Sequence, residues 1–188
     1  MVATPQPTKM TVEAYLDWEP CQELRYEYVN GDVLAMTGGT LPHNDIALNV
    51  YAALRPHLRA KNCRGNVVDA KVQVMPTLYR YPDVVTSCDE CDLTALKAIC
   101  YPNLIVEVLS PGTEALDRGQ KFEEYRTLPS LQAYILVSAA ALRVEVYRRG
   151  EGRLWLYSPY QRGDTLSLDF LGFECPIEQF YEGVTEFC

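Results

Sequence analysis

The feature that most constrains the fold is a carboxylate inside a strongly apolar stretch of the chain. Glu107 interrupts the run Asn-Leu-Ile-Val-Glu-Val-Leu-Ser at positions 103–110. Such a run is typical of a central β-strand that is buried on both faces. An ionised carboxylate is costly to bury without a partner, so Glu107 predicts a bound cation, a buried ion pair with Arg or Lys, or a strand end that faces solvent. A functional role is our working hypothesis.

A second acid, Asp83, follows Pro82 and precedes Val84-Val85-Thr86. Pro-Asp alone is a common turn dipeptide, so Asp83 gains its weight from Glu107. Two neighbouring strands that each offer one carboxylate at similar depth can converge on one divalent ion, and oxygen ligands suit Mg²⁺. We therefore predict that Asp83 and Glu107 bind Mg²⁺ or Mn²⁺.

Asp117, Lys121 and Tyr125 are spaced four residues apart, which places them on one side of a predicted helix. A helix N-cap would explain Asp117 fully, with Gln120 in the capping-box position. Lys121 fits a solvated helix face. It is also the nearest candidate for the cation that phosphodiester hydrolysis needs near the scissile phosphate.

The pattern along the chain predicts an α+β or α/β fold with a mixed sheet flanked by helices. We expect a loose tail over residues 1–10 and a single domain over 11–188. Asn30-Gly31 between two alternating runs predicts a β-hairpin. The other predicted elements are helices from Thr11 to Trp18 and from Ala47 to Leu58 (containing Pro56), partial helix at 93–98, and strands at 67–75, 79–86 paired with 103–109, 131–137, 142–147 and 154–157.

The net charge of −8 argues against a protein that coats nucleic acid non-specifically, because such binding depends on Lys and Arg displacing counterions. It does not exclude a nuclease, since a carboxylate cluster adds negative charge of its own. Four basic residues either face a phosphate backbone or solvate the end of a helix: Arg55, Arg59, Lys61 and Arg64.

The cysteines favour a reduced, cytoplasmic protein. Seven cysteines is an odd number, and we see neither a signal peptide nor a segment that could span a membrane. Cys88 and Cys91 form a CxxC pair with Cys100 nearby. That set is a weak zinc signal, so we expect free thiols in a loop.

Several motifs, in this order, resemble the Uma-two family of putative restriction endonucleases, which is similar to the PD-(D/E)XK nucleases. The resemblance runs from about Tyr15 to Phe180. It rests on Glu27 in Arg-Tyr-Glu-Tyr-Val-Asn-Gly-Asp, His43 after a Gly-rich loop, Pro82-Asp83-Val84, Val106-Glu107-Val108-Leu109-Ser110-Pro111, Asp117 with Lys121 and Tyr125, and Tyr134-Ile135-Leu136-Val137.

The resemblance implies a restriction-endonuclease-like fold and a complete catalytic site. In the parent motif a lysine stands two positions after the acid, where this chain has Leu109, and Lys121 on the following helix is the implied substitute. Glu27 is either a third acid near the metal or the polar face of a hairpin strand. His43 caps the next helix, ligates the metal or accepts a proton from water. His57 has no such support.

These observations predict a metal-dependent endonuclease in which Asp83, Glu107 and Lys121 act on a phosphodiester of DNA, assisted by His43 and Glu27. A homodimer is expected because one site cuts one strand of a duplex. The alternative is a non-catalytic module that binds nucleic acid or protein and retains the fold. A third hypothesis is a sugar- or nucleotide-processing hydrolase, but we find no phosphate-binding glycine loop and no nucleophile elbow in the sequence.

Overall fold

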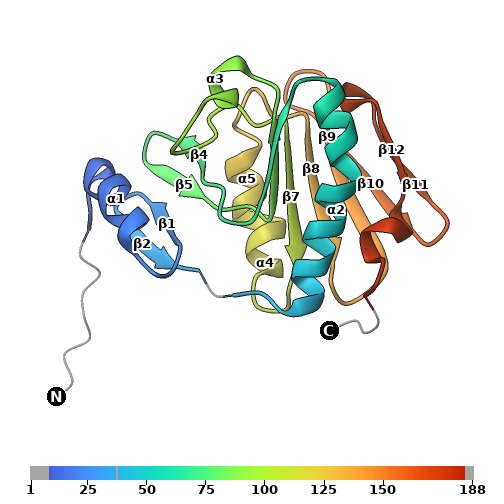
Figure 1. Ribbon diagram of the computed structural model, residues 1–188, viewed down its shortest axis with the longest axis horizontal. Helices are drawn as coiled ribbons and strands as arrows, with labels where there is room; N and C mark the ends of the chain where they lie inside the picture. The colour runs from blue at the N-terminus through green and yellow to red at the C-terminus, as the bar shows by residue number, and fades with distance from the viewer. Residues whose placement is uncertain (1–8, 37, 185–188) are drawn as a thin grey trace.

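The computed structural model describes residues 9–36 and 38–184, so most of the predicted tail lies outside the described residues. A six-stranded sheet forms the centre of the molecule, and a smaller four-stranded sheet stands beside it (Figure 1). The long helix α2 and the C-terminal hairpin pack on one face of the central sheet. The other face packs against the helical segment that follows β7 and against part of the smaller sheet.

The smaller sheet has the strand order β2-β1-β5-β4 and is covered by α1. The Asn30-Gly31 hairpin is confirmed: Asn30 has φ 49° and Gly31 φ 99°, the two positive values of a tight type I′ turn. Thr11 caps α1 as predicted, its Oγ1 accepting a hydrogen bond from the Ala14 amide at 3.2 Å. The elements are α1 (Val12–Trp18), η1 (Glu19–Cys21), β1 (Tyr26–Val29), β2 (Asp32–Ala35), β4 (Val72–Met75) and β5 (Leu78–Arg80).

The central sheet has the order β10-β9-β8-β7-β6-β3 and is mixed, as predicted. Only β7 and β8 run parallel among its described pairs, and the helical segment between them makes the crossover that a parallel pair requires. The strands are β3 (Arg64–Val67), β6 (Val84–Ser87), β7 (Leu104–Leu109), β8 (Ala133–Ser138), β9 (Arg143–Arg149) and β10 (Trp155–Gln161).

The helices and the C-terminal elements complete the layers. Pro56 lies inside α2 without ending it, since the helix continues to Ala60. These elements are α2 (Leu41–Ala60), α3 (Glu90–Leu93), α4 (Glu114–Leu116), the π-helical segment η2 (Asp117–Lys121), α5 (Phe122–Tyr125), β11 (Thr165–Leu168), η3 (Asp169–Leu171), β12 (Phe173–Pro176) and η4 (Ile177–Tyr181).

Two predicted strands are each divided between the two sheets. The strand expected over 67–75 breaks where Val68 and Asp69 both adopt φ 51°, a left-handed conformation that ends β3 before β4 begins. The strand expected over 79–86 breaks at Tyr81–Asp83, so β5 joins the small sheet and only β6 pairs with β7. The predicted helix at 93–98 is wrong in position, because the helical turn α3 ends at Leu93.

The expectation of free thiols is wrong for Cys88. It forms a disulfide with Cys63, 25 residues earlier, and their Cα atoms lie 4.2 Å apart. Cys63 directly precedes β3 and Cys88 directly follows β6, so antiparallel pairing of these strands brings the two thiols together. Cys91 and Cys100 are free, and the CxxC pair is therefore divided.

None of the helices in the described ranges is long and apolar enough to cross a membrane.

Candidate active site

The pairing of β6 with β7 brings the two predicted metal-binding acids together. Val84 pairs with Val106, which places Asp83 opposite Glu107 one step further along the antiparallel register. Asp83 Oδ2 accepts a hydrogen bond from the Val108 amide at 2.7 Å, so β7 fixes the carboxylate of its neighbour. Every residue of β7 is buried, as the sequence predicted, and Glu107 is only 3% exposed.

Both acids line a pocket of about 450 Å³ at the end of the central sheet. Its wall includes the Gly38-Gly39-Thr40 segment, the start of α2 and the helical segment after β7. Four of the five predicted site residues contribute to this wall, namely His43, Asp83, Glu107 and Lys121.

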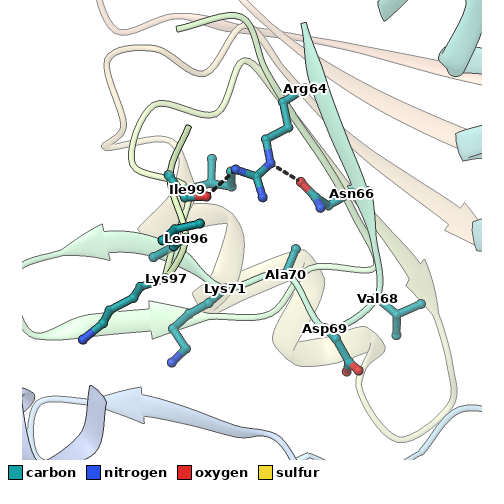
Figure 2. Close-up of a pocket in the computed structure, with 11 residues that line it drawn as sticks. Arg64, Asn66, Val68, Asp69, Ala70, Lys71, Leu96, Lys97 and Ile99 are labelled. Carbon is teal, nitrogen blue, oxygen red and sulfur yellow. Dashed lines mark hydrogen bonds between the residues drawn. The ribbon is translucent and has the colours of Figure 1, made fainter. Parts of the chain in front are cut away.

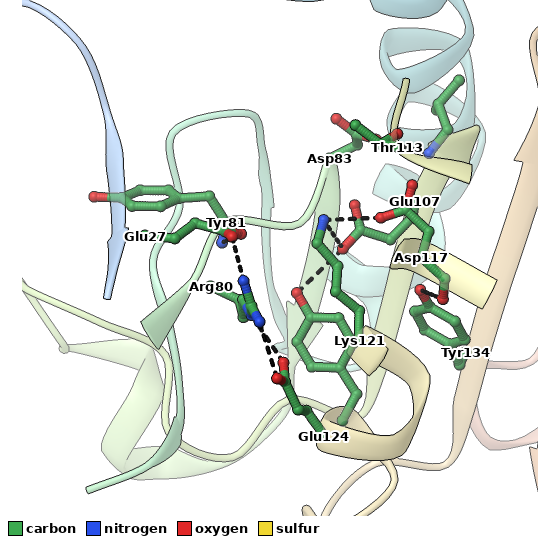
Figure 3. A network of polar contacts seen from close by, with 12 residues as sticks. Glu27, Arg80, Tyr81, Asp83, Glu107, Thr113, Asp117, Lys121, Glu124 and Tyr134 are labelled. Atoms are coloured by element: carbon green, nitrogen blue, oxygen red, sulfur yellow. Dashed lines mark hydrogen bonds and ion pairs between the residues drawn. The ribbon is translucent and has the colours of Figure 1, made fainter. Parts of the chain in front are cut away.

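Lys121 reaches the buried carboxylate from its helix, as the substitution of the motif lysine requires. Its Nζ lies 3.1 Å from Glu107 Oε1 and 2.9 Å from Asp117 Oδ1 (Figure 3). All three side chains are less than 10% exposed. The ammonium is therefore held between two carboxylates at the bottom of the pocket.

Asp117 is a site residue that sequence reasoning missed. It was expected to be a helix N-cap, but the helix starts earlier, with Thr113 as N-cap, and the Asp117 amide already bonds to the Thr113 carbonyl at 3.0 Å. Its carboxylate is buried and faces Lys121 instead of capping the helix. The four-residue spacing to Lys121 was the available signal, and the capping explanation outweighed it.

The helix is π-helical over Asp117–Lys121, between the α-helical turns α4 and α5. Single π-helical turns inside α-helices are rare and frequently occur at functional sites. The wider turn contains both Lys121 and the acid that binds it.

Two tyrosines hold the buried groups in place. Tyr125 donates from its hydroxyl to Glu107 Oε1 at 3.1 Å, the same oxygen that contacts Lys121. Tyr134 on β8 donates to the Asp117 main-chain oxygen at 2.9 Å. One carboxylate oxygen of Glu107 thus receives two donors, while no donor among the described residues reaches Oε2.

The electrostatics of the cluster favour an added cation. Burial raises the pKa of Glu107 well above its usual value, and the nearby charges of Asp83 and Asp117 raise it further, against the opposing effect of Lys121. Burial alone would lower the pKa of Lys121, but the charges of Glu107 and Asp117 outweigh it and raise that pKa. Lys121 therefore stays protonated, and its ammonium contacts the carboxylates of Glu107 and Asp117.

His43 lies in the first turn of α2, with Nε2 3.3 Å from Asp83 Oδ2. Burial lowers its pKa, but the hydrogen bond and charge of Asp83 outweigh burial and raise the pKa above its usual value. Nδ1 is buried and has no hydrogen-bond partner in the described part of the chain. Gly39 leaves room for the ring, because a Cβ there would stand 2.7 Å from Nδ1.

Glu27 lies outside this pocket. Its Oε2 is 2.5 Å from a guanidinium nitrogen of Arg80, which is 1% exposed and also binds Glu124 through two hydrogen bonds of 2.8 and 2.9 Å (Figure 3). This ion-pair group joins β1, β5 and α5. Glu27 is buried and does not line the pocket, but its charge is among those that raise the pKa of Lys121.

Comparison with known proteins identifies the family and supports the fold. The sequence profile of the Uma2 family, described as a putative restriction endonuclease, matches residues 12–178. The chain belongs to the Uma2 family. The resemblance that the motifs carried is thereby confirmed, and both family and fold are restriction-endonuclease-like.

Two relatives come from Synechocystis sp., and a similar fold occurs among solved structures. The uncharacterized protein slr1290 is 38% identical and covers 94% of this chain and 93% of its own length. The uncharacterized protein sll1609 is 30% identical, with 86% and 92% covered. A crystal structure of a putative nuclease of DUF820 from Anabaena variabilis superposes with a TM-score of 0.73, covering 92% of this Uma2 chain and 98% of its own, at 14% identity. That low identity supports the fold alone.

Proposed function

We propose that this Uma2 protein is a Mg²⁺- or Mn²⁺-dependent endonuclease that hydrolyses phosphodiester bonds of DNA in the cytoplasm. The observation that carries the proposal is the position of the Lys121 ammonium, 3.1 Å from Glu107 in a pocket shared with Asp83. A lysine buried between two carboxylates on the wall of an open pocket is costly to desolvate, which supports a functional role for this cluster.

The carboxylates suit a hard divalent cation. Asp83 Oδ2 and Glu107 Oε1 already have donors, whereas Asp83 Oδ1 and Glu107 Oε2 receive none from the described residues. No three His, Cys, Asp or Glu side chains in the described ranges form a metal site by themselves. That is compatible with Mg²⁺, which usually keeps several waters and takes one or two carboxylates together with substrate phosphate. When bound, the ion would supply an activated water and neutralise phosphate charge.

The chain's own residues have separate tasks in this proposal. Lys121 places a positive charge where negative charge develops on the phosphate during hydrolysis. Asp117 and Tyr125 hold the lysine and the Glu107 carboxylate in position. His43, with its free Nδ1 and its contact to Asp83, is a candidate to accept a proton from water.

The alternative is a binding module that retains the fold without cleaving. Two observations favour it: the net charge of −8, and the engagement of the Lys121 ammonium by two carboxylates. The homodimer predicted from the sequence belongs to the nuclease proposal, because two sites would cut two strands. A monomeric mass in light scattering would remove that part.

The test is nicking of supercoiled plasmid with Mg²⁺ or Mn²⁺ beside an EDTA control. Lys121→Met should lower cleavage by roughly two to three orders of magnitude, the usual effect of losing one transition-state donor. Lys121→Arg should recover little, because a broad guanidinium does not copy a compact ammonium. Arg153→Gln, on the exposed turn between β9 and β10, is the control. Full activity in Lys121→Met, or no metal-dependent nicking by the wild type, would favour the binding module.

A further inference from the structure

Three hollows on the surface share lining residues, and the first of them is the catalytic pocket, which is lined by Asp83 and Glu107. Asp69 lines all three of them. The second hollow, of about 270 Å³, shares Arg25 and Tyr81 with the catalytic pocket. The third, of about 290 Å³, shares Lys71 and Lys97 with the second (Figure 2). We call these neighbouring hollows together the side groove.

The sign of the charge changes along the side groove. The catalytic pocket is dominated by carboxylates, whereas four basic residues line the two further hollows, Arg25, Lys71, Lys97 and Arg64. Two of these four are engaged within the protein. The Lys71 amine is buried against Glu19 Oε2 at 3.0 Å. The Arg64 guanidinium holds the 92–95 loop and Asn66 through hydrogen bonds (Figure 2).

Arg25 and Lys97 remain available to a ligand. Arg25 makes no side-chain hydrogen bond with any described residue; its contacts are Asp69 at 3.6 Å and Glu19 at 3.9 Å. Buried Arg80, by contrast, is fully engaged by two carboxylates. Lys97 is 70% exposed, and its contact to Asp17 is 3.9 Å long. The pairs of Arg25 with Asp69 and of Lys97 with Asp17 are long and exposed, and such pairs contribute little, so an anion can replace them.

A strained turn connects the groove to the catalytic acids. Val68 has φ 51°, which is a genuine outlier for a β-branched residue, and Asp69 repeats that conformation. The Val68 amide donates to the Asp83 main-chain oxygen at 2.9 Å. Such strain persists only where the surroundings impose it, and it is concentrated at functional sites. The turn thus sets the position of Asp69 beside Arg25 relative to the catalytic pocket.

We propose that the side groove binds the phosphate backbone of the substrate strand next to the scissile bond, with Arg25 and Lys97 contacting successive phosphates. The inference rests on the proposed function and adds to it the path of the strand. Arg25 offers the planar fork that matches a phosphate, and Lys97 a point charge. Asp69 acts in the opposite sense, because its carboxylate repels the phosphate that Arg25 attracts.

The test is binding of a labelled oligonucleotide, with Ca²⁺ in place of Mg²⁺, measured by fluorescence anisotropy over a range of salt concentrations. Arg25→Gln and Lys97→Gln should each raise Kd about tenfold. Each should also reduce the slope of log K against log salt by about 0.7 to 0.9, the value for one phosphate contact. Asp69→Asn should tighten binding about threefold. Arg153→Gln, at the opposite edge of the central sheet, is the matched control.

The outcomes separate this inference from the proposed function. The groove would be overturned, and the nuclease proposal left intact, if the wild type cleaves DNA while Arg25→Gln and Lys97→Gln bind the oligonucleotide as Arg153→Gln does. If the oligonucleotide binds with the expected salt slopes but is not cleaved, the groove would be supported and the nuclease proposal would fail. The groove would also be overturned if the wild type bound no oligonucleotide. The same holds if inorganic phosphate displaced the labelled oligonucleotide as effectively as the unlabelled strand does. Exposed Lys97 provides a variant whose folding is not at risk.

Discussion

Replacing Lys121 by Met tests the charge balance of the site without a substrate. The variant leaves Asp83, Glu107 and Asp117 around one pocket with no ammonium between them. Breaking a buried ion pair by removing one partner costs about 3–5 kcal/mol. For a chain of this size, about 2–4 °C of Tm corresponds to each kcal/mol. In EDTA near neutral pH we therefore expect Tm to fall by roughly 6–20 °C. Met fills nearly the same volume, so packing changes little.

The loss should depend on pH with a defined sign. The pKa of Glu107 in the folded protein is raised by burial and by its acidic neighbours. When the pKa of an acid is higher in the folded than in the unfolded protein, the folded state binds more protons at pH values between the two pKa values. The free energy of unfolding therefore falls as pH rises through that range. Lys121 lowers the pKa of folded Glu107, so its removal raises that pKa further and extends this pH range upward. The Tm difference between wild type and Lys121→Met should thus be small in acid and grow as pH rises.

The assay is thermal unfolding by circular dichroism in EDTA, from about pH 5 to about pH 8, which brackets ordinary and raised carboxyl pKa values. A double variant, Lys121→Met with Glu107→Gln, removes one of the unpaired charges and should recover part of the lost Tm at the upper end. A Tm loss that is equal at all pH values, or no recovery in the double variant, would refute the reasoning. It would mean that the ammonium does not compensate Glu107 in solution.

Three further predictions concern the same region. Glu107→Gln and Asp83→Asn should each abolish Mn²⁺ binding in calorimetric titration while the fold remains intact; unchanged affinity would contradict their assignment as ligands. The contact of His43 with Asp83 raises the histidine pKa, so it contributes stability below the ordinary histidine pKa that is lost as pH rises through the raised one. The Tm difference between wild type and His43→Gln should accordingly shrink with rising pH, and a constant difference would argue against the pair. Cys63→Ser should lower the free energy of unfolding by about 3–4 kcal/mol, the loop-closure value for 25 residues. Reductant should reproduce that loss in the wild type and leave the variant unchanged.

The sequence predicted what is encoded in local pattern. The apolar run around Glu107 is a buried central strand, and the Asn30-Gly31 turn forms its hairpin, because burial periodicity and positive φ are properties of a few adjacent residues. The division of strands between the two sheets was not predicted. It depends on the left-handed conformation of Val68 and Asp69, and the sequence did not predict it because a β-branched residue such as Val68 rarely adopts that conformation.

In the site too, local spacing could be read from the sequence, whereas contacts between distant residues could not. The spacing of Asp117 and Lys121 was visible, but Asp117 with Gln120 also matches a capping box, and a π-helical turn has no distinct sequence signature, so Asp117 was assigned to the wrong role. Glu27 was a candidate because it stands in the motif Arg-Tyr-Glu-Tyr-Val-Asn-Gly-Asp that resembles the family. Its carboxylate is occupied by Arg80, which lies 53 residues later, and that pairing depends on how the small sheet packs.

The π-helical segment lets this helix hold one more residue than a regular α-helical turn would. A π-helical turn closes its hydrogen bonds five residues apart instead of four, so a one-residue deletion inside it can be absorbed by a return to α-helical geometry. Gly119 lies midway between Asp117 and Lys121, and a Cβ added there would meet no heavy atom within 4 Å. Deletion of Gly119 would therefore leave Asp117 and Lys121 three residues apart on one face of a regular turn. The core would be kept, while the geometry that now places the Lys121 ammonium 3.1 Å from Glu107 would change.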